Sequence, residues 1–133
     1  MSVGTVMTTN TGMTTNTGHR IEIADSDAHV RVEVDGVTVA ETRSARLLHE
    51  TGLPPRWYLP LADVDPDVLR PSDFGSHCPF KGDASYYDVE VGGVRRQNLI
   101  WSYAEPIPGA AAIAGMLSFY PDRATVFVDG EQI

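Results

Sequence analysis

The chain has 133 residues, of which 42% are hydrophobic, and it carries a formal net charge of −8 at pH 7. Its ten Lys and Arg residues are too few to form the basic surface that binding to nucleic acid or to an anionic membrane requires. No apolar run has the roughly 18 residues of a membrane span, and the N-terminus lacks the pattern of a signal peptide, so we expect a cytoplasmic protein.

The N-terminal segment, residues 1–19, is predicted to be a flexible tail. Residues 7–12 and 13–18 repeat the hexapeptide MTTNTG. A repeat this short and polar cannot bury enough surface to offset the entropy lost when it becomes ordered. An arm that binds a partner is the alternative. The remaining residues, 20–133, are long enough to form a single domain with one core.

Apolar residues alternate with charged ones directly after the tail, which is the pattern of half-buried strands. The alternating positions are Ile21, Ile23, Val30, Val32, Val34, Val37 and Val39. Asp35-Gly36 separates two of these runs, and both residue types tolerate the positive φ of a two-residue hairpin turn. The sequence therefore predicts two or three antiparallel strands.

The middle of the chain is punctuated by glycine and proline. Ser44 is expected to cap a helical turn over residues 45–48, which Gly52 ends. Residues 56–61 are predicted to form a short strand between prolines. Residues 63–69 are predicted to form another single helical turn.

The last third again has the period of strands. Residues 85–91 and 94–103 are predicted to pair through a turn at Gly92-Gly93. Residues 110–117 suit a brief helix or a buried strand, and residues 124–128 a final strand. Because no helix reaches a dozen residues, we predict a mainly β, antiparallel domain with short helices.

A polar segment between turn residues, Pro71 to Val91, is predicted to hold the functional site as a pinned loop. Cys78 could act as a nucleophile activated by His77 or Lys81, or it could be a small buried apolar side chain. Lys81 could bind an anion, act as a base or form an imine, or it could be a solvated lysine paired with Asp83. Gly82 would let the backbone approach a ligand closely.

The aromatic residues near this segment could form the walls of a pocket. Tyr86 and Tyr87 point to opposite faces of the predicted strand, so only one of them can face a pocket together with Lys81. Tyr58, Trp101 and Tyr103 also lie on predicted strands. Burial in the core is the alternative role for all of these rings.

Three carboxylates lie beside turns and are candidates for general acid or base catalysis, namely Glu50, Asp63 and Glu105. Helix caps and surface ion pairs are the alternative roles. The single cysteine excludes an internal disulfide, and the four scattered histidines offer no paired spacing for a metal. We therefore expect neither a bound metal nor another cofactor.

Five segments together resemble one family: VAETR, LLHETGLPPRWYLPLADV, CPFKGDASYYDV, IWSYAEP and IAGMLSFYPDR. The resemblance covers about residues 20–129 and is to the bacterial domain of unknown function family number 427, which some catalogues label as a nucleotidyltransferase domain. It implies a fold similar to the two-sheet β-tent of zinc-binding domains that include methionine sulfoxide reductases. Those relatives hold zinc with four cysteines, whereas this chain has one.

The resemblance also implies a shared pocket. The residues that match the family motifs are Glu50, Tyr58, Pro60, Asp63, Cys78, Pro79, Lys81, Gly82, Tyr86, Trp101, Tyr103 and Pro106. From the residues and the resemblance together, we expect catalytic roles for Lys81, Cys78, Glu50 and Tyr87. Ligand contacts are expected from Tyr58, His77, Gly82, Tyr86, Trp101, Tyr103 and Glu105.

The leading functional hypothesis is an enzyme that acts on a small organic metabolite by metal-independent acid–base or covalent chemistry. Isomerase, cyclase, lyase and hydrolase reactions all suit such a site, and a bacterial biosynthetic pathway would suit the enzyme. A binding module without turnover is the first alternative. A nucleotidyltransferase that holds Mg²⁺ through Asp63 and Asp65 is the second. Small molecules are the expected partners, and a homodimer is an alternative that the sequence does not decide.

Overall fold

The computed structural model describes residues 19–133, so the MTTNTG repeats of the predicted tail lie outside the described part of the chain. Strands dominate the described residues, which confirms the prediction of a mainly β, antiparallel domain with short helices. The strands are β1 (Ile21–Asp25), β2 (Val30–Val34), β3 (Val37–Thr42), β4 (Arg46–Glu50), β5 (Arg56–Tyr58), β6 (Leu69–Cys78), β7 (Gly82–Val91), β8 (Val94–Ser102), β9 (Leu117–Phe119), β10 (Thr125–Val128) and β11 (Glu131–Gln132).

Three short 3-10 helices join these strands: η2 (Leu61–Asp63), η3 (Pro66–Val68) and η4 (Pro108–Ile113). η3 lies within the helical turn predicted over residues 63–69, whereas η2 overlaps that turn only at Asp63. η4 overlaps residues 110–117, for which a brief helix or a buried strand was predicted. None of the helices in residues 19–133 has the length and apolar character that a membrane crossing needs.

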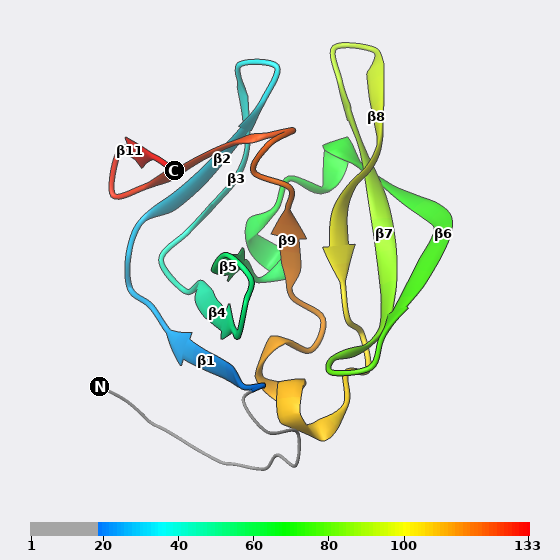
Figure 1. Ribbon diagram of the computed structural model, residues 1–133. Helices are drawn as coiled ribbons and strands as arrows, with labels where there is room; N and C mark the ends of the chain where they lie inside the picture. The colour runs from blue at the N-terminus through cyan, green and yellow to red at the C-terminus, as the bar shows by residue number, and fades with distance from the viewer. Residues whose placement is uncertain (1–18) are drawn as a thin grey trace.

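The strands pair in three antiparallel sheets, with the orders β1-β4-β5, β11-β10-β2-β3 and β6-β7-β8-β9. Figure 1 shows β9 between β5 and β8. There, Leu59 and Leu117 exchange two backbone hydrogen bonds of 2.8 Å. This bridge joins two of the sheets edge to edge into one surface of seven strands, which we call the joined sheet. The expected two-sheet arrangement is thus built from three hydrogen-bonded sheets.

The main core lies between the joined sheet and the β11-β10-β2-β3 sheet. Val30, Val32 and Val34 of β2 are at most 2% exposed, as their alternation predicted. They belong to one apolar cluster with Leu99 and Ile100 of β8, together with other residues of both sheets.

A second apolar cluster lies apart from this main core. It contains Leu48, Tyr58, Ala84, Trp101, Tyr103, Ala110, Ile113 and Met116. Strands β4, β5, β7 and β8 contribute to it, and η4 adds Ala110 and Ile113. The joined sheet therefore carries apolar residues in two clusters, as strands buried on both faces do.

The hairpin predicted at Asp35-Gly36 is confirmed. These two residues have φ values of 52° and 79°, and Val34 pairs with Val37 across the turn. Positive φ at both central positions is what a type I′ turn requires.

Two local predictions were wrong. Residues 45–48 were expected to be helical, but β4 (Arg46–Glu50) occupies this segment and pairs with both β1 and β5. The supposed loop before Cys78 is the strand β6, which pairs with β7 and shifts register between Pro71 and Gly75. In both segments, hydrogen bonds to distant strands override the local sequence preference.

Candidate functional site

A cavity of about 160 Å³ lies beside the second apolar cluster. Its lining residues are Leu48, Glu50, Leu53, Pro54, Arg56, Tyr58, Lys81, Tyr86, Trp101, Tyr103 and Tyr120. Strand parity explains part of this set, because side chains two positions apart share a face of a sheet. Leu48 and Glu50 of β4 and Arg56 and Tyr58 of β5 are such pairs.

An ion pair between Glu50 and Lys81 lies in this cavity. Glu50 ends β4, and Lys81 ends the turn between β6 and β7, 31 positions later in the chain. The Lys81 Nζ donates a hydrogen bond to the Glu50 Oε1, and the two side chains are only 11% and 5% exposed. Desolvation of two charges is costly even when they are paired, so the position of this pair beside open volume points to chemistry.

His19 completes the environment of the Glu50 carboxylate. Its Nε2 lies 3.0 Å from the Glu50 Oε2, and its ring stacks on Phe80 with the centroids 3.7 Å apart. Both carboxylate oxygens therefore have a partner, which fixes their orientation. No feature of the sequence indicates this contact, because His19 is the last residue of a polar segment that we assigned to the tail.

The turn that carries Lys81 is held by backbone contacts. The Lys81 N–H donates to the Cys78 carbonyl oxygen at 3.2 Å, and the Ile107 N–H donates to the Lys81 carbonyl oxygen at 2.9 Å. Gly82 has a φ of 117°, and a Cβ there would lie 3.3 Å from both the Pro106 Cα and the Ile107 N. The close approach expected at Gly82 is thus made by the backbone of residues 105–107, which holds the turn in place.

Aromatic rings form much of the cavity wall. Tyr86 of β7 and Trp101 of β8 are direct cross-strand partners. The Trp101 Nε1 donates to the Tyr58 hydroxyl at 2.9 Å, and the Tyr120 ring lies 4.5 Å from the Trp101 ring. The structure thus brings together four aromatic residues proposed from the sequence, Tyr58, Tyr86, Trp101 and Tyr103, and adds Tyr120.

The hydroxyls of Tyr58, Tyr103 and Tyr120 stay protonated at neutral pH. Burial raises the pKa of Tyr58 to about 12, and burial with a hydrogen bond to Tyr86 raises the pKa of Tyr120 to about 12. Burial also holds the pKa of Tyr103 well above its usual value. These groups can therefore donate hydrogen bonds to a ligand oxygen.

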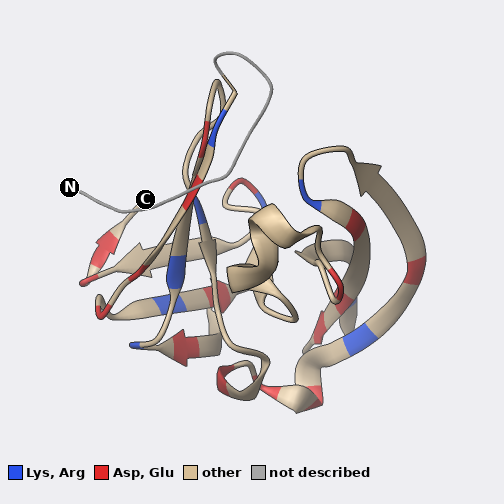
Figure 2. Cartoon of the chain, turned by 90° about the horizontal axis from the view of Figure 1, so that it is seen from below, with Lys and Arg blue, Asp and Glu red and all other residues tan. Residues whose placement is uncertain are grey.

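Arg56 adds a second positive charge to the cavity. Its guanidinium carbon lies 5.8 Å from the centre of the Trp101 ring. Figure 2 shows acidic and basic residues interspersed along the described chain, whereas η4 contains no charged residue. Arg56 was not predicted from the sequence, because one arginine between a proline and a tryptophan has no distinctive spacing.

Five of the proposed site residues do not line the cavity. One of them is Gly82, which faces the backbone of residues 105–107 instead of a ligand. Cys78 is partly buried against the second apolar cluster, as in its structural alternative. Tyr87 packs on the main core between the sheets. His77 is exposed and lies 2.7 Å from Asp83, and Glu105 is exposed. Of the four proposed catalytic residues, only Lys81 and Glu50 meet.

The acidic residues that could suit a metal-dependent transferase have contacts within the fold. The Asp63 Oδ2 accepts a hydrogen bond of 2.7 Å from the Thr42 hydroxyl. The Asp65 Oδ1 accepts one of 2.9 Å from the Asp67 N–H and so caps η3. In residues 19–133, no three His, Cys, Asp or Glu side chains gather in a geometry that could hold a metal ion.

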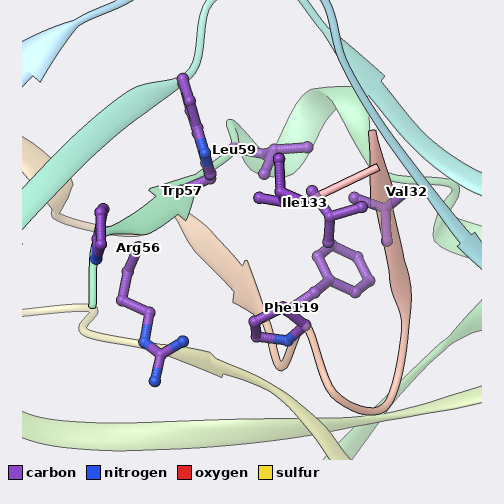
Figure 3. Close-up of a pocket in the computed structure, with 9 residues that line it drawn as sticks. Val32, Arg56, Trp57, Leu59, Phe119 and Ile133 are labelled. Carbon is purple, nitrogen blue, oxygen red and sulfur yellow. The ribbon is translucent and has the colours of Figure 1, made fainter. Parts of the chain in front are cut away.

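A second hollow has a volume of about 20 Å³ and is mainly apolar. Val32, Leu59, Phe119 and Ile133 surround it, while the Arg56 side chain extends away from this group (Figure 3). The volume is about that of one water molecule. It is too small for an organic ligand, so the larger cavity is the candidate site.

Comparison with known proteins places the chain in a family. No curated protein matches it. The sequence profile of a family described as "Domain of unknown function (DUF427)" matches residues 22–130. This span includes the cavity residues from β4 to Tyr120, and the description assigns no activity to them. The chain therefore belongs to the DUF427 family.

Proposed function

We propose that this protein is an enzyme that acts on a small organic molecule by acid–base catalysis in the aromatic cavity. The observation that carries the proposal is the Glu50–Lys81 ion pair, which is buried yet lies beside about 160 Å³ of open volume. Titratable groups that converge in a concave, mainly apolar pocket are a common feature of active sites.

The two charged groups keep capacity for a substrate. Lys81 has three N–H donors and uses one of them for Glu50. Each Glu50 oxygen has two lone pairs, and the contacts with Lys81 and His19 occupy one on each oxygen. The pair can therefore stay intact while Lys81 donates to a substrate oxygen and Glu50 accepts a substrate proton.

The proposed reaction begins with proton transfer from carbon. Glu50 removes a proton from the carbon next to a carbonyl group, and the electron pair of the broken C–H bond moves onto the carbonyl oxygen. The Lys81 ammonium and the Tyr58 hydroxyl stabilise the resulting negative charge. Return of the proton to a different carbon completes an isomerisation, whereas departure of a neighbouring leaving group with its electron pair completes an elimination.

Cys78 has no part in this proposal. It does not line the cavity, and its side chain packs with apolar neighbours. A thiolate nucleophile needs a polar environment that lowers its pKa. The proton transfer is therefore assigned to Glu50, and stabilisation of the negative charge to Lys81 and Tyr58.

Deuterium incorporation tests the proposal without knowledge of the natural substrate. The full chain is incubated in D₂O with a panel of ketones and oxo acids no larger than one substituted ring, and NMR follows exchange at the carbon next to the carbonyl group. We expect exchange with the wild type and none above background with Glu50→Gln, which keeps the shape of the side chain but is not a base.

Glu131→Gln, at an exposed position on β11, is the matched control and should exchange as the wild type does. Equal exchange by Glu50→Gln and the wild type would contradict the assignment. Panel compounds that bind in the cavity but never exchange would favour the binding module without turnover.

A further inference from the structure

We propose that the cavity selects a small planar monoanion, such as an aromatic or unsaturated carboxylate, with its anionic group on Arg56 and its planar body against Trp101. This inference rests on the proposed function only in that it concerns the same cavity. It names the class of ligand and the residue that determines the charge preference.

Arg56 is unusual among the arginines of this chain. Six others form ion pairs with carboxylates, namely Arg20, Arg31, Arg46, Arg70, Arg95 and Arg96. Arg43 and Arg123 donate to backbone carbonyl oxygens. Within residues 19–133, Arg56 alone has a guanidinium with neither an ion pair nor a hydrogen bond, although it is half-buried.

The charges in the cavity place the anion at Arg56. Lys81 is already neutralised by Glu50, so it offers little net attraction. An anion beside Lys81 would also lie close to the Glu50 carboxylate, which would repel it. Arg56 has no such neighbour, and its planar fork of donors can bind a carboxylate through two parallel hydrogen bonds.

The walls favour a flat ligand. Arg56 pairs with Leu48 across β4 and β5, and its guanidinium carbon is 5.8 Å from the Trp101 ring centre. A ligand whose carboxylate binds Arg56 can therefore place its body along the indole. Aromatic rings gain from offset or edge-on contact with one another, and Tyr86 and Tyr120 supply further rings on this wall.

The size of the cavity sets an upper limit. Its volume of about 160 Å³ is close to that of engineered apolar cavities that accept benzene, which are about 150 Å³. Leu53, which is 57% exposed, marks a side open to solvent. One ring with a carboxylate is the ligand that fits these dimensions, and benzoate is a suitable probe.

The test compares three probes of equal size, benzoate, benzamide and benzylammonium, by NMR titration of the full chain with the indole signals as reporters. We expect benzoate to bind at least about tenfold more tightly than benzamide, because one desolvated charge pair is worth that much or more. Benzylammonium, which Arg56 repels, should bind most weakly.

Arg56→Met keeps the length of the side chain and removes its charge. It should weaken benzoate binding roughly tenfold and leave benzamide binding unchanged, while Arg56→Lys should restore part of the loss. Arg43→Met is the matched control, because the native Arg43 guanidinium lies against the Asp27 carbonyl oxygen. The inference is overturned if no probe binds, if benzamide binds as tightly as benzoate, or if Arg56→Met binds benzoate as the wild type does.

Glu50→Gln separates the failure of this inference from failure of the proposed function. It should bind benzoate at least as tightly as the wild type, because it removes a negative charge, yet it should not exchange deuterium. Exchange that depends on Glu50 without a preference for benzoate refutes only the ligand class. A preference for benzoate without any exchange refutes only the acid–base function.

Discussion

The Trp101 indole N–H donates a hydrogen bond of 2.9 Å to the Tyr58 hydroxyl and so ties β8 to β5 on the wall of the cavity. The two strands belong to different hydrogen-bonded sheets, which meet at the bridge between Leu59 and Leu117. The bond therefore supports the junction of the joined sheet at the point where the cavity lies.

Loss of the Tyr58 hydroxyl should destabilise the fold. Tyr58→Phe leaves the Trp101 N–H buried without its acceptor, and an unsatisfied buried donor costs about 1–3 kcal/mol. Tyr103→Phe is the matched control, because Tyr103 is also buried and its hydroxyl makes no hydrogen bond within residues 19–133. Urea unfolding checks the difference, and equal losses in the two variants would contradict the role of this bond.

Removal of one member of the Glu50–Lys81 pair should lower the free energy of unfolding more than replacement of both members by apolar residues. Lys81→Met leaves a buried carboxylate without its main partner, which we expect to lower the free energy of unfolding by about 3 kcal/mol. The double variant Glu50→Leu with Lys81→Met removes both charges and should recover most of this loss. Urea unfolding at pH 7 measures both values. A double variant as unstable as Lys81→Met would show that the charge is not the cause.

Replacement of Gly82 should destabilise the fold more than replacement of other glycines with positive φ. An alanine there would have a φ of 117° and its Cβ 3.3 Å from backbone atoms of Pro106 and Ile107. We expect Gly82→Ala to lower the stability by about 1–3 kcal/mol. Gly36→Ala faces open space at a φ of 79° and should lose less. Thermal unfolding compares the melting temperatures of the two variants. Equal decreases would contradict the role given to the close backbone contact at Gly82.

Asp88 should make stability depend on pH. Its Oδ1 accepts the Asn98 N–H and its Oδ2 accepts the Arg95 Nε–H, both at 2.8 Å. The Asn98 N–H first, and then Arg95, hold the pKa of Asp88 below its usual value. The folded state therefore favours the ionised carboxylate. This stabilisation is fully present above the unfolded pKa and is lost as the pH falls through the lowered folded value.

The corresponding measurement compares the wild type with Asp88→Asn. We expect the variant to be less stable by about 1 kcal/mol at pH 7. This difference in the free energy of unfolding should shrink as the pH falls below the usual pKa of an aspartate. Asp73→Asn, at an exposed position on β6, should show no such gap. A gap for Asp88→Asn that is independent of pH would contradict the ionic origin.

Nucleotide with Mg²⁺ should leave the melting temperature unchanged. Asp63 and Asp65 face Thr42 and the N–H of Asp67 in the fold, so their recorded contacts are structural. Thermal unfolding with ATP and MgCl₂ checks this expectation. A clear rise that Asp63→Asn abolishes would instead support the transferase alternative.

Part of the fold was predictable because local pattern and tertiary environment agree. The alternation of β2 and the turn at Asp35-Gly36 specify a hairpin without help from distant residues. Strands β4 and β6 were missed for the opposite reason. Arg46 and His49 hide the alternation of β4, and Pro71 and Gly75 interrupt β6, so in each strand the hydrogen bonds to neighbours determine the conformation.

Individual site residues could be predicted from the sequence, but their arrangement in space could not. Lys81 and Glu50 were each proposed from the sequence, yet nothing local indicates that residues 31 positions apart form a pair. Parity separated Tyr86 from Tyr87 correctly without saying which faces the cavity. Arg56 carried no signal, because its distinction is the absence of a partner in the folded chain.

The decisive measurement for the role of Glu50 is the rate of deuterium incorporation into a carbonyl compound that binds the cavity, compared between the wild type and Glu50→Gln. We expect exchange by the wild type and only background exchange by the variant, with both proteins folded and both binding the compound. Equal rates in the two proteins would contradict the claim that Glu50 and Lys81 form an acid–base pair.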